Sequence, residues 1–165
     1  MEPWLNFLHR MKNATKTVRI GLVGKYVELP DAYKSINESL FQAATYNDRK
    51  LDLQYIHSEK LNSGNVDAML SSLDGVLIAP GFGQRGIEGK FIALKYAREH
   101  DIPTFGVCLG MQCMVIEYAR DVLGYTDANS TEMDVTTKHN VIDLMEEQKN
   151  VTNMGGSMRL GAYDC

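Results

Sequence analysis

The chain has 165 residues, of which 44% are hydrophobic and 23% charged, and its formal net charge is −4 at pH 7. These proportions are typical of one globular domain, and the negative charge argues against a nucleic-acid or anionic-membrane partner. The sequence contains no apolar run long enough to span a bilayer, and its three cysteines are too few for a disulfide framework. We therefore expect a cytoplasmic protein with free thiols.

The predicted elements alternate between helices and strands along most of the chain. Helical spacing of apolar residues predicts helices over residues 2–12, 32–46, 66–73 and 90–100, and another after Cys108. Apolar or alternating runs predict strands over residues 17–23, 51–56, 75–79 and 103–107. This alternation predicts an α/β fold with an open, mostly parallel sheet that helices cover on both faces.

The pattern is less regular near the end of the chain. The helix after Cys108 presents one apolar face, made of Met111, Met114, Val115, Tyr118, Ala119 and Val122. Beyond Asp127 the periodicity weakens, and residues 141–145 and 158–162 are predicted as short edge strands. The apolar strands and helices before that point supply the expected core.

Cys108 lies in a Gly-x-Cys-x-Gly turn between a predicted strand and a predicted helix. Such a corner holds one side chain in a strained, exposed position, where it presents a nucleophile beside backbone N–H groups that receive an oxyanion. Glycine is needed at positions 106 and 110 because a Cβ there would collide with the neighbouring strand or helix. The turn predicts an enzyme that forms a covalent thioester on Cys108.

Two other segments are expected at the same edge of the sheet, where parallel α/β folds carry their chemistry. A Pro-Gly-Phe-Gly loop follows the neighbouring strand, and the N–H groups of Gly81 and Leu109 form the natural oxyanion pair. A polar loop over residues 127–132 follows the helix after Cys108. From there Glu132, together with Gln112, is placed to hold a small polar substrate by its amide and ammonium ends.

Each of these features also has a simpler interpretation. A cysteine after an apolar strand is often a small buried hydrophobe, and the glycine-rich loop over 80–89 fits a surface turn. That loop lacks the spacing of a phosphate-binding motif, and the spacing of Cys108 and Cys113 matches no zinc site, so no metal is expected. The run beginning at His57 has the form His-x-Glu and stays open as a base, because a triad is defined by geometry.

The turn and the segments around it resemble the class I glutamine amidotransferases, whose signature is a Gly-x-Cys-x-Gly-x-Gln elbow. More narrowly, the chain is similar to the glutaminase domains of the CTP synthase family in four stretches, residues 24–35, 82–90, 127–132 and 155–162. The resemblance implies the flavodoxin-like fold of that family over residues 17–165. It also implies that residues 1–16 form a linker helix to a synthetase domain.

The resemblance further implies a function for each part of the predicted site. Cys108 would attack the side-chain amide of L-glutamine, and Gly81 and Leu109 would stabilise the oxyanion. The residues implied in glutamine binding are Gly81, Leu109, Gly110, Met111, Gln112 and Glu132. The loop that carries Phe82, Arg85 and Glu88 would lie near the site of GTP, an allosteric activator.

The remaining partners implied by the resemblance lie outside this chain. The glutaminase domain itself needs no cofactor, and its ammonia passes to a synthetase domain. That domain uses ATP and Mg to aminate UTP to CTP, within a full enzyme that is a homo-oligomer. No nucleic acid and no membrane is implied.

Two departures from the family pattern affect these expectations. Pro80 replaces the first of two glycines, but Gly81 is kept, so we expect the oxyanion hole to survive. The family's base, a histidine in a His-x-Glu run near the C-terminus, is absent before Cys165. We therefore expect poor glutamine hydrolysis from a truncated domain, since a general base contributes roughly 10²–10⁴-fold. Two alternatives stay open, another cysteine hydrolase of this architecture and a non-catalytic fragment that docks on the synthetase domain.

Overall fold

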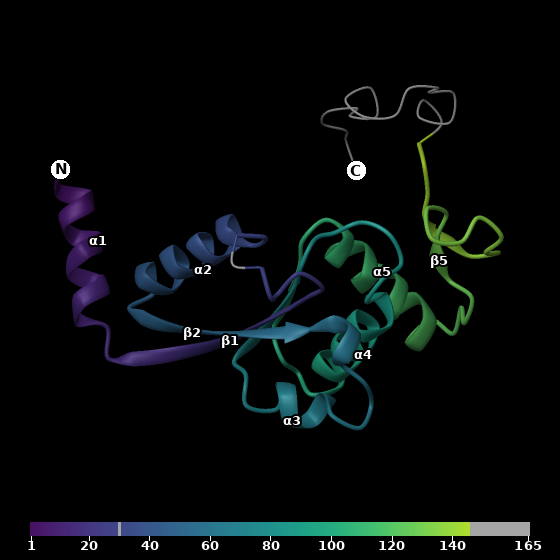
Figure 1. Cartoon of the computed structure of the whole chain (residues 1–165), viewed down its shortest axis with the longest axis horizontal. Coiled ribbons are helices and arrows are strands. Elements are labelled where there is room, and N and C mark those ends of the chain that lie inside the picture. Colours follow the sequence, from purple (N-terminus) through teal and green to yellow (C-terminus); the bar gives the residue numbers. More distant parts are fainter. Residues whose placement is uncertain (30, 146–165) are drawn as a thin grey trace.

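The computed structural model describes residues 1–29 and 31–145, and its centre is a parallel sheet flanked by helices (Figure 1). The sheet contains β1 (Lys16–Gly24), β2 (Arg49–His57), β3 (Gly75–Ile78) and β4 (Thr104–Gly106). Their order is β2-β1-β3-β4, and all neighbouring strands pair in parallel. The predicted open, parallel α/β fold is therefore confirmed.

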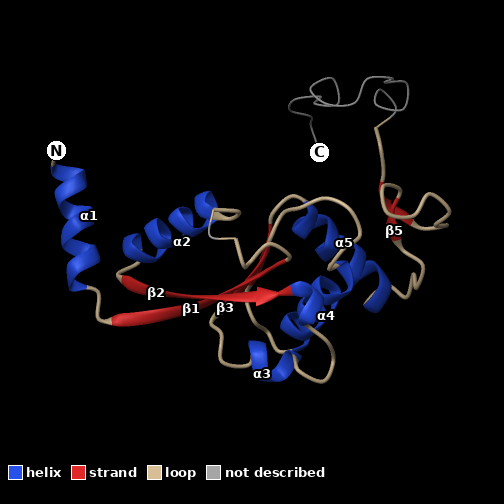
Figure 2. Cartoon of the chain, in the orientation of Figure 1, coloured by secondary structure: helices blue, strands red, loops and turns tan. Residues whose placement is uncertain are grey.

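The helices lie on both sides of this sheet (Figure 2). They are α1 (Glu2–Asn13), α2 (Lys34–Tyr46), α3 (Val66–Leu70), α4 (Ile87–Glu99) and α5 (Leu109–Asp121), with a 3₁₀ turn η1 (Ser58–Lys60) after β2. The neighbours Leu22 and Val23 of β1 are both fully buried but belong to different core clusters, because successive strand side chains point to opposite faces. Val23 packs toward α3, α4 and α5, whereas Leu22 packs toward α2.

Helix α4 begins three residues earlier than the sequence predicts. Gly86 precedes it with a φ of 75°, a left-handed conformation that glycine adopts without strain. The first turn then packs against η1 so closely that a Cβ on Gly89 would lie 1.7 Å from the Ser58 carbonyl oxygen. The predicted loop over 80–89 is shortened accordingly, and Glu88 belongs to the helix.

The apolar face predicted for α5 is largely wrong. Met111, Val115, Tyr118 and Val122 are exposed among the described residues. The buried positions are Leu109, Gly110, Cys113, Ile116, Glu117 and Ala119.

The physical reason is a charged residue on the buried side of α5. Glu117 is only 4% exposed because Arg98 of α4 donates to its carboxylate at 2.7 Å. Carboxylates are rarely buried without such a partner. A pattern that counts apolar residues alone therefore selects the wrong face of this helix.

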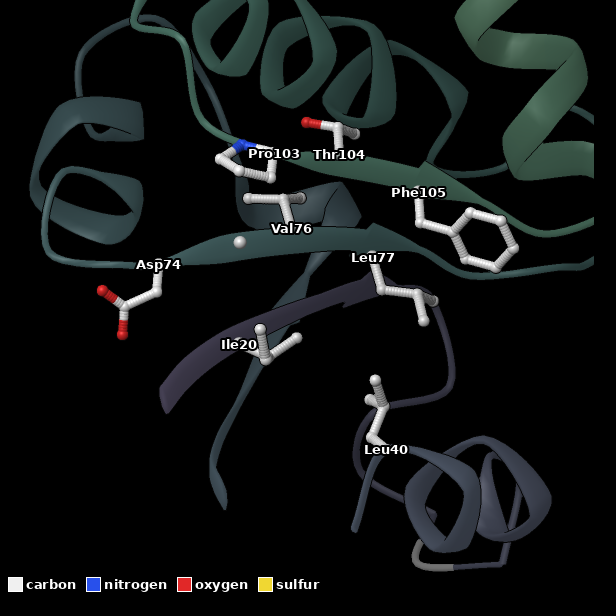
Figure 3. A pocket seen from close by; sticks show the side chains of 9 residues that line it. Ile20, Leu40, Asp74, Val76, Leu77, Pro103, Thr104 and Phe105 are labelled. Carbon is white, nitrogen blue, oxygen red and sulfur yellow. The ribbon is translucent and has the colours of Figure 1, made fainter. Parts of the chain in front are cut away.

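An apolar groove lies on the α2 face of the sheet beside β4 (Figure 3). Leu40 of α2, Leu77 of β3 and Phe105 of β4 contribute to its wall, and its volume is about 250 Å³. Phe105 is 66% exposed. The expected cover on both faces is therefore incomplete, because α2 packs over β1 and β2 and leaves β4 open in the described part of the chain.

The two ends of the described chain lie apart from the sheet (Figure 1). Helix α1 has no buried residue and contacts α2, where the rings of Phe7 and Phe41 meet edge to face at 6.4 Å. After α5, the short strands β5 (Asn129–Ser130) and β6 (Asn140–Ile142) pair with each other as a separate sheet. The strand predicted over 141–145 is thus shorter, and it does not join the main sheet.

Two further expectations concern the ends of the chain. The strand predicted over 158–162 and the stretch over 155–162 lie outside the described residues. The division into a linker over 1–16 and a domain over 17–165 stays a prediction. Within residues 1–29 and 31–145, no helix has the length and apolar character needed to cross a membrane.

Candidate active site

Cys108 lies where β4 ends and α5 begins, and its backbone has a φ of 53°. A positive φ is uncommon outside glycine, and only Asp48 and Asp101 share it among the described non-glycine residues. The cysteine is the N-cap residue of α5 and its side chain is exposed. The predicted strained and exposed corner is therefore confirmed.

Glycines on either side of Cys108 allow the turn to close. A Cβ on Gly106 would lie 2.5 Å from the backbone nitrogen of Met111. A Cβ on Gly110 would lie 2.1 Å from the carbonyl oxygen of Ile78 in β3. Any side chain at either position would push α5 away from the sheet, as the sequence predicts.

The structure brings Gly81 and Leu109 side by side. β3 and β4 are neighbours, so the loop after β3 and the turn after β4 meet at one edge. A Cβ built on Gly81 would lie 3.9 Å from Cδ2 of Leu109. Neither backbone N–H donates to an acceptor within the described part of the chain. Both are free to bind an oxyanion, and that role stays a prediction.

Gln112 lies one turn into α5, where its backbone N–H donates to the Cys108 carbonyl at 3.1 Å. Its side-chain oxygen Oε1 is buried and has no hydrogen-bond partner among the described residues. Buried polar atoms are normally paired, so an unpartnered one beside a candidate nucleophile suits a ligand. The N–H of Gly110 is not available to a ligand, because it already donates to the Val107 carbonyl at 2.8 Å. Met111 has an exposed side chain.

Glu132 is exposed, and its backbone N–H donates to the Ser130 hydroxyl at 3.1 Å. No hydrogen bond or ion pair joins its carboxylate to Gln112 or Cys108 in residues 1–29 and 31–145. The loop that carries Glu132 is nevertheless tied to the loop after β3, because Gln84 Nε2 donates to the Met133 carbonyl at 2.6 Å.

The three residues expected near an effector are all exposed, two of them on the loop after β3 and one on α4. Phe82 is 80% exposed, and Glu88 is an exposed residue in the first turn of α4. The guanidinium of Arg85 is 2.9 Å from the carboxylate of Glu59 and lies over the ring of Tyr26, 5.3 Å from its centroid.

The structure argues against His57 as the base. Its Nδ1 accepts a hydrogen bond from the Glu59 backbone and so caps η1. β2 and β4 are opposite edges of the described sheet, with β1 and β3 between them. Adjacent strands are about 4.8 Å apart, which places His57 about 14 Å from the turn at Cys108.

Two buried lysines that border the Gly81 loop were not predicted from the sequence. Lys90 is 1% exposed, and its Nζ donates to the Ala79 carbonyl at 2.7 Å. Lys25 is 6% exposed, and its Nζ donates to the Phe82 carbonyl. The sequence could have indicated that Lys90 is buried, because it shares one face of α4 with three buried positions at helical spacing. Those positions are Ala93, Leu94 and Ala97.

Burial dominates the electrostatics of this region. It lowers the pKa of Lys90, and the neighbouring Lys25 adds to that effect, while the thiols of Cys113 and Cys108 oppose it. Burial also raises the pKa of Cys113 to about 11, although Lys90 lowers it in part. Cys113 is therefore a neutral thiol at physiological pH and cannot balance the lysine charge.

Comparisons with known proteins agree with this geometry. A family model described as glutamine amidotransferase class-I matches residues 28–165. A CTP synthase of Bacteroides fragilis is 71% identical over 163 residues, which are 99% of this chain and 31% of the relative. A CTP synthase of Porphyromonas gingivalis is 66% identical over 165 residues, which are 100% of this chain and 31% of the relative.

A solved structure gives the same match in three dimensions. It is described as the glutaminase domain of Trypanosoma brucei CTPS with bound acivicin. The TM-score is 0.75 at 40% identity, over 81% of this chain and 52% of that one. The chain thus spans about a third of the length of the curated relatives and about half of the solved relative.

Proposed function

Because the chain belongs to the class-I glutamine amidotransferase family, we propose that it releases ammonia from L-glutamine through a thioester on Cys108. The observation that carries the proposal is the position of Cys108, exposed at a positive φ on the N-terminus of α5. Gly81 and Leu109 are neighbours at this turn, and among the described residues their N–H groups have no acceptor and the buried oxygen of Gln112, one turn later, has no donor.

The chemistry assigns one step to each group. The Cys108 sulfur forms a bond to the side-chain carbonyl carbon of glutamine, and the electron pair of the C=O bond moves onto oxygen. Gly81 and Leu109 donate hydrogen bonds to that oxyanion, which is usually the largest single contribution in acyl transfer. The intermediate collapses with cleavage of the C–N bond, and the thiol proton leaves with the ammonia. Water then attacks the thioester carbon, the C–S bond breaks, and glutamate and the free Cys108 thiol result.

The same proposal assigns the substrate-binding residues. Gln112 accepts from a polar group of the bound glutamine through the buried Oε1. Glu132 pairs with the α-ammonium, which suits an exposed carboxylate on a loop tied to Gln84. Gly110 and Met111 shape the floor of the site through their backbone.

We further propose that the chain is the glutaminase part of a CTP synthase. Its whole length matches relatives that carry this name. In this proposal the ammonia passes to a synthetase domain, which uses ATP and Mg to aminate UTP to CTP. The complete enzyme is a homo-oligomer in the cytoplasm.

GTP is the proposed activator of the glutaminase step, at Phe82 and Arg85 of the loop after β3 and Glu88 in the first turn of α4. The support is the exposed guanidinium of Arg85, which can exchange the carboxylate of Glu59 for a phosphate. The exposed ring of Phe82 offers a surface on which a purine can stack.

The test uses a chloroketone analogue of glutamine, in which a CH₂Cl group replaces the amide NH₂. Attack by the Cys108 sulfur at the CH₂ carbon forms a C–S bond and releases chloride, so labelling reports the nucleophile with its binding site. We expect mass spectrometry to find the label on Cys108, with protection by L-glutamine but not by L-asparagine. Cys108→Ala abolishes labelling, whereas Cys113→Ala retains it.

A second variant tests recognition apart from reactivity. Glu132→Gln removes the charge that pairs with the α-ammonium, and a hydrogen bond to a charged group contributes about 1.5–3 kcal/mol. The inhibition constant should therefore rise about tenfold or more with a similar maximal rate. Labelling without protection by glutamine would instead indicate another cysteine hydrolase. A Cys108→Ala substitution without effect on any activity of the complete enzyme would indicate a docking fragment.

A further inference from the structure

The loop that presents Gly81 is held at both ends by buried lysines. Ala79 is fully buried, its N–H donates to Val23 of β1 at 2.9 Å, and its carbonyl accepts from Lys90. Three residues later the Phe82 carbonyl accepts from Lys25. Between these points lie only Pro80 and Gly81.

These two hydrogen bonds restrict the peptide group between Pro80 and Gly81, whose N–H would donate to the oxyanion. A carbonyl and the N–H of the next residue share one plane, so fixing the carbonyls of Ala79 and Phe82 fixes the planes on both sides. Pro80 has a φ locked near −65°, which removes one of the two soft backbone torsions between the Ala79 carbonyl and the Gly81 N–H. The Gly81 N–H is therefore restricted in direction although glycine itself is flexible.

Lys90 also places positive charge within electrostatic range of Cys108, and neither lysine forms an ion pair with a carboxylate in residues 1–29 and 31–145. A lysine is almost never fully buried unless it is paired, yet Lys90 forms no ion pair with a carboxylate among the described residues. Burial of Cys113 keeps that thiol neutral. The Cys108 sulfur is the other thiol within electrostatic range of Lys90. A negative charge that develops at Cys108 or on the oxyanion would meet an uncompensated ammonium.

We propose that Lys90 and Lys25 are positioning residues of this site, a two-lysine clamp that orients the Gly81 N–H and supplies positive charge to the reacting centre. The inference rests on the proposed function, because it gives the clamp a role in forming the oxyanion. Neither lysine touches the substrate. Each acts through the carbonyl that it holds and through its charge.

The experiment compares three substitutions in the full chain. Lys90→Met and Lys25→Met keep most of the side-chain volume but remove the charge and the donor. Lys95→Met is the matched control, since Lys95 lies on α4 as well but is half-exposed and pairs with Asp121 at 3.2 Å. Each protein is treated with the glutamine chloroketone, and separately with iodoacetate and iodoacetamide, which differ in charge.

We expect the maximal chloroketone rate to fall roughly tenfold in Lys90→Met and Lys25→Met, with an inhibition constant within about twofold of the original. The ratio of iodoacetate to iodoacetamide labelling at Cys108 should fall roughly three- to tenfold, because the positive charge favours the anionic reagent. Lys95→Met should change neither quantity. The urea midpoint of Lys90→Met should be equal to or above the original, since a buried charge is removed.

An unchanged maximal rate and an unchanged reagent ratio in both variants would overturn the proposal. If Lys90→Met does not fold, Lys25→Met decides by the same two criteria, because Lys25 lies outside α4. If the chloroketone labels none of the proteins, the proposed glutaminase function fails, whereas the reagent ratio still tests the charge of the clamp.

Discussion

Two thiols at the start of α5 differ in surroundings although five positions separate them. Cys108 precedes the helix at a positive φ and faces solvent. Cys113 is fully buried in the core between the sheet and the helices. The close backbone contacts at Gly106 and Gly110 shape the turn that exposes Cys108. Cys113 is buried because it lies on the face of α5 that packs against the sheet.

This contrast predicts the order in which the two thiols react. Iodoacetamide at pH 8 should label Cys108 and leave Cys113 unmodified, because Cys113 is buried and its pKa is raised to about 11. Mass spectrometry of peptides after limiting exposure resolves each cysteine. Unfolding in urea serves as the control, since both thiols should then react at similar rates. Labelling of Cys113 first in the folded protein would contradict the structure.

At the scale of elements, the orientation of α5 is set by its contacts with α4 and β3. Gly110 allows close approach to the Ile78 carbonyl, and the Arg98–Glu117 pair joins α5 to α4 at 2.7 Å. Ile116 is fully buried, whereas Val115 is 39% exposed. Neighbouring residues of one helix thus belong to opposite faces.

This orientation predicts different costs for two adjacent truncations. Ile116→Ala should lower the free energy of unfolding by about 2–5 kcal/mol, because it opens a cavity in the core. Val115→Ala should lower it by about 0.5 kcal/mol or less, as substitutions at exposed positions usually do. Urea denaturation of both variants measures the difference. Equal losses, or a larger loss at Val115, would show that the helix is rotated from the described orientation.

At the scale of the whole molecule, the strand order assembles the site from distant parts of the chain. β1 and β3 lie in the middle of the described sheet, so Lys25 after β1 and Gly81 after β3 meet. α4 then returns across the sheet and brings Lys90 beneath the same loop. The fold therefore contains a buried ammonium group, and its desolvation has a cost in the free energy of unfolding.

That cost predicts a dependence of stability on pH. Burial lowers the pKa of Lys90 below its ordinary value of 10.5, so the unfolded chain binds its proton more tightly than the folded protein. The contribution of Lys90 to the free energy of unfolding therefore rises with pH, from the lowered pKa up to 10.5. Lys90→Met should be the more stable protein near pH 7, and its advantage should shrink as the pH approaches 10.

The measurement compares urea midpoints of the two proteins at several pH values. Both proteins are compared in a Cys113→Ala background, because the raised pKa of Cys113 weakens the fold above pH 9 and Lys90 itself lowers that pKa in part. An advantage of Lys90→Met that does not change between pH 7 and pH 10 would contradict a lowered pKa of Lys90.

The features that depend on near neighbours could be predicted from the sequence. The turn at Cys108 could be predicted because Gly106, Cys108 and Gly110 lie within five residues and obey local sterics. The parallel α/β fold followed from the alternation of apolar strands and helices, which the chain repeats in order. Even here the start of α4 was missed, because packing of Gly89 on η1 extends the helix.

Which distant groups meet could not be predicted in this way, because it depends on the order of the strands and the packing of the helices. Gly81 and Leu109 become neighbours because β3 pairs with β4, and His57 is kept away because β2 lies at the other edge. The buried face of α5 depends on a carboxylate that is neutralised by another helix. A lysine in a sequence indicates an exposed charge, and only the packing around Lys90 shows a buried one held by a carbonyl.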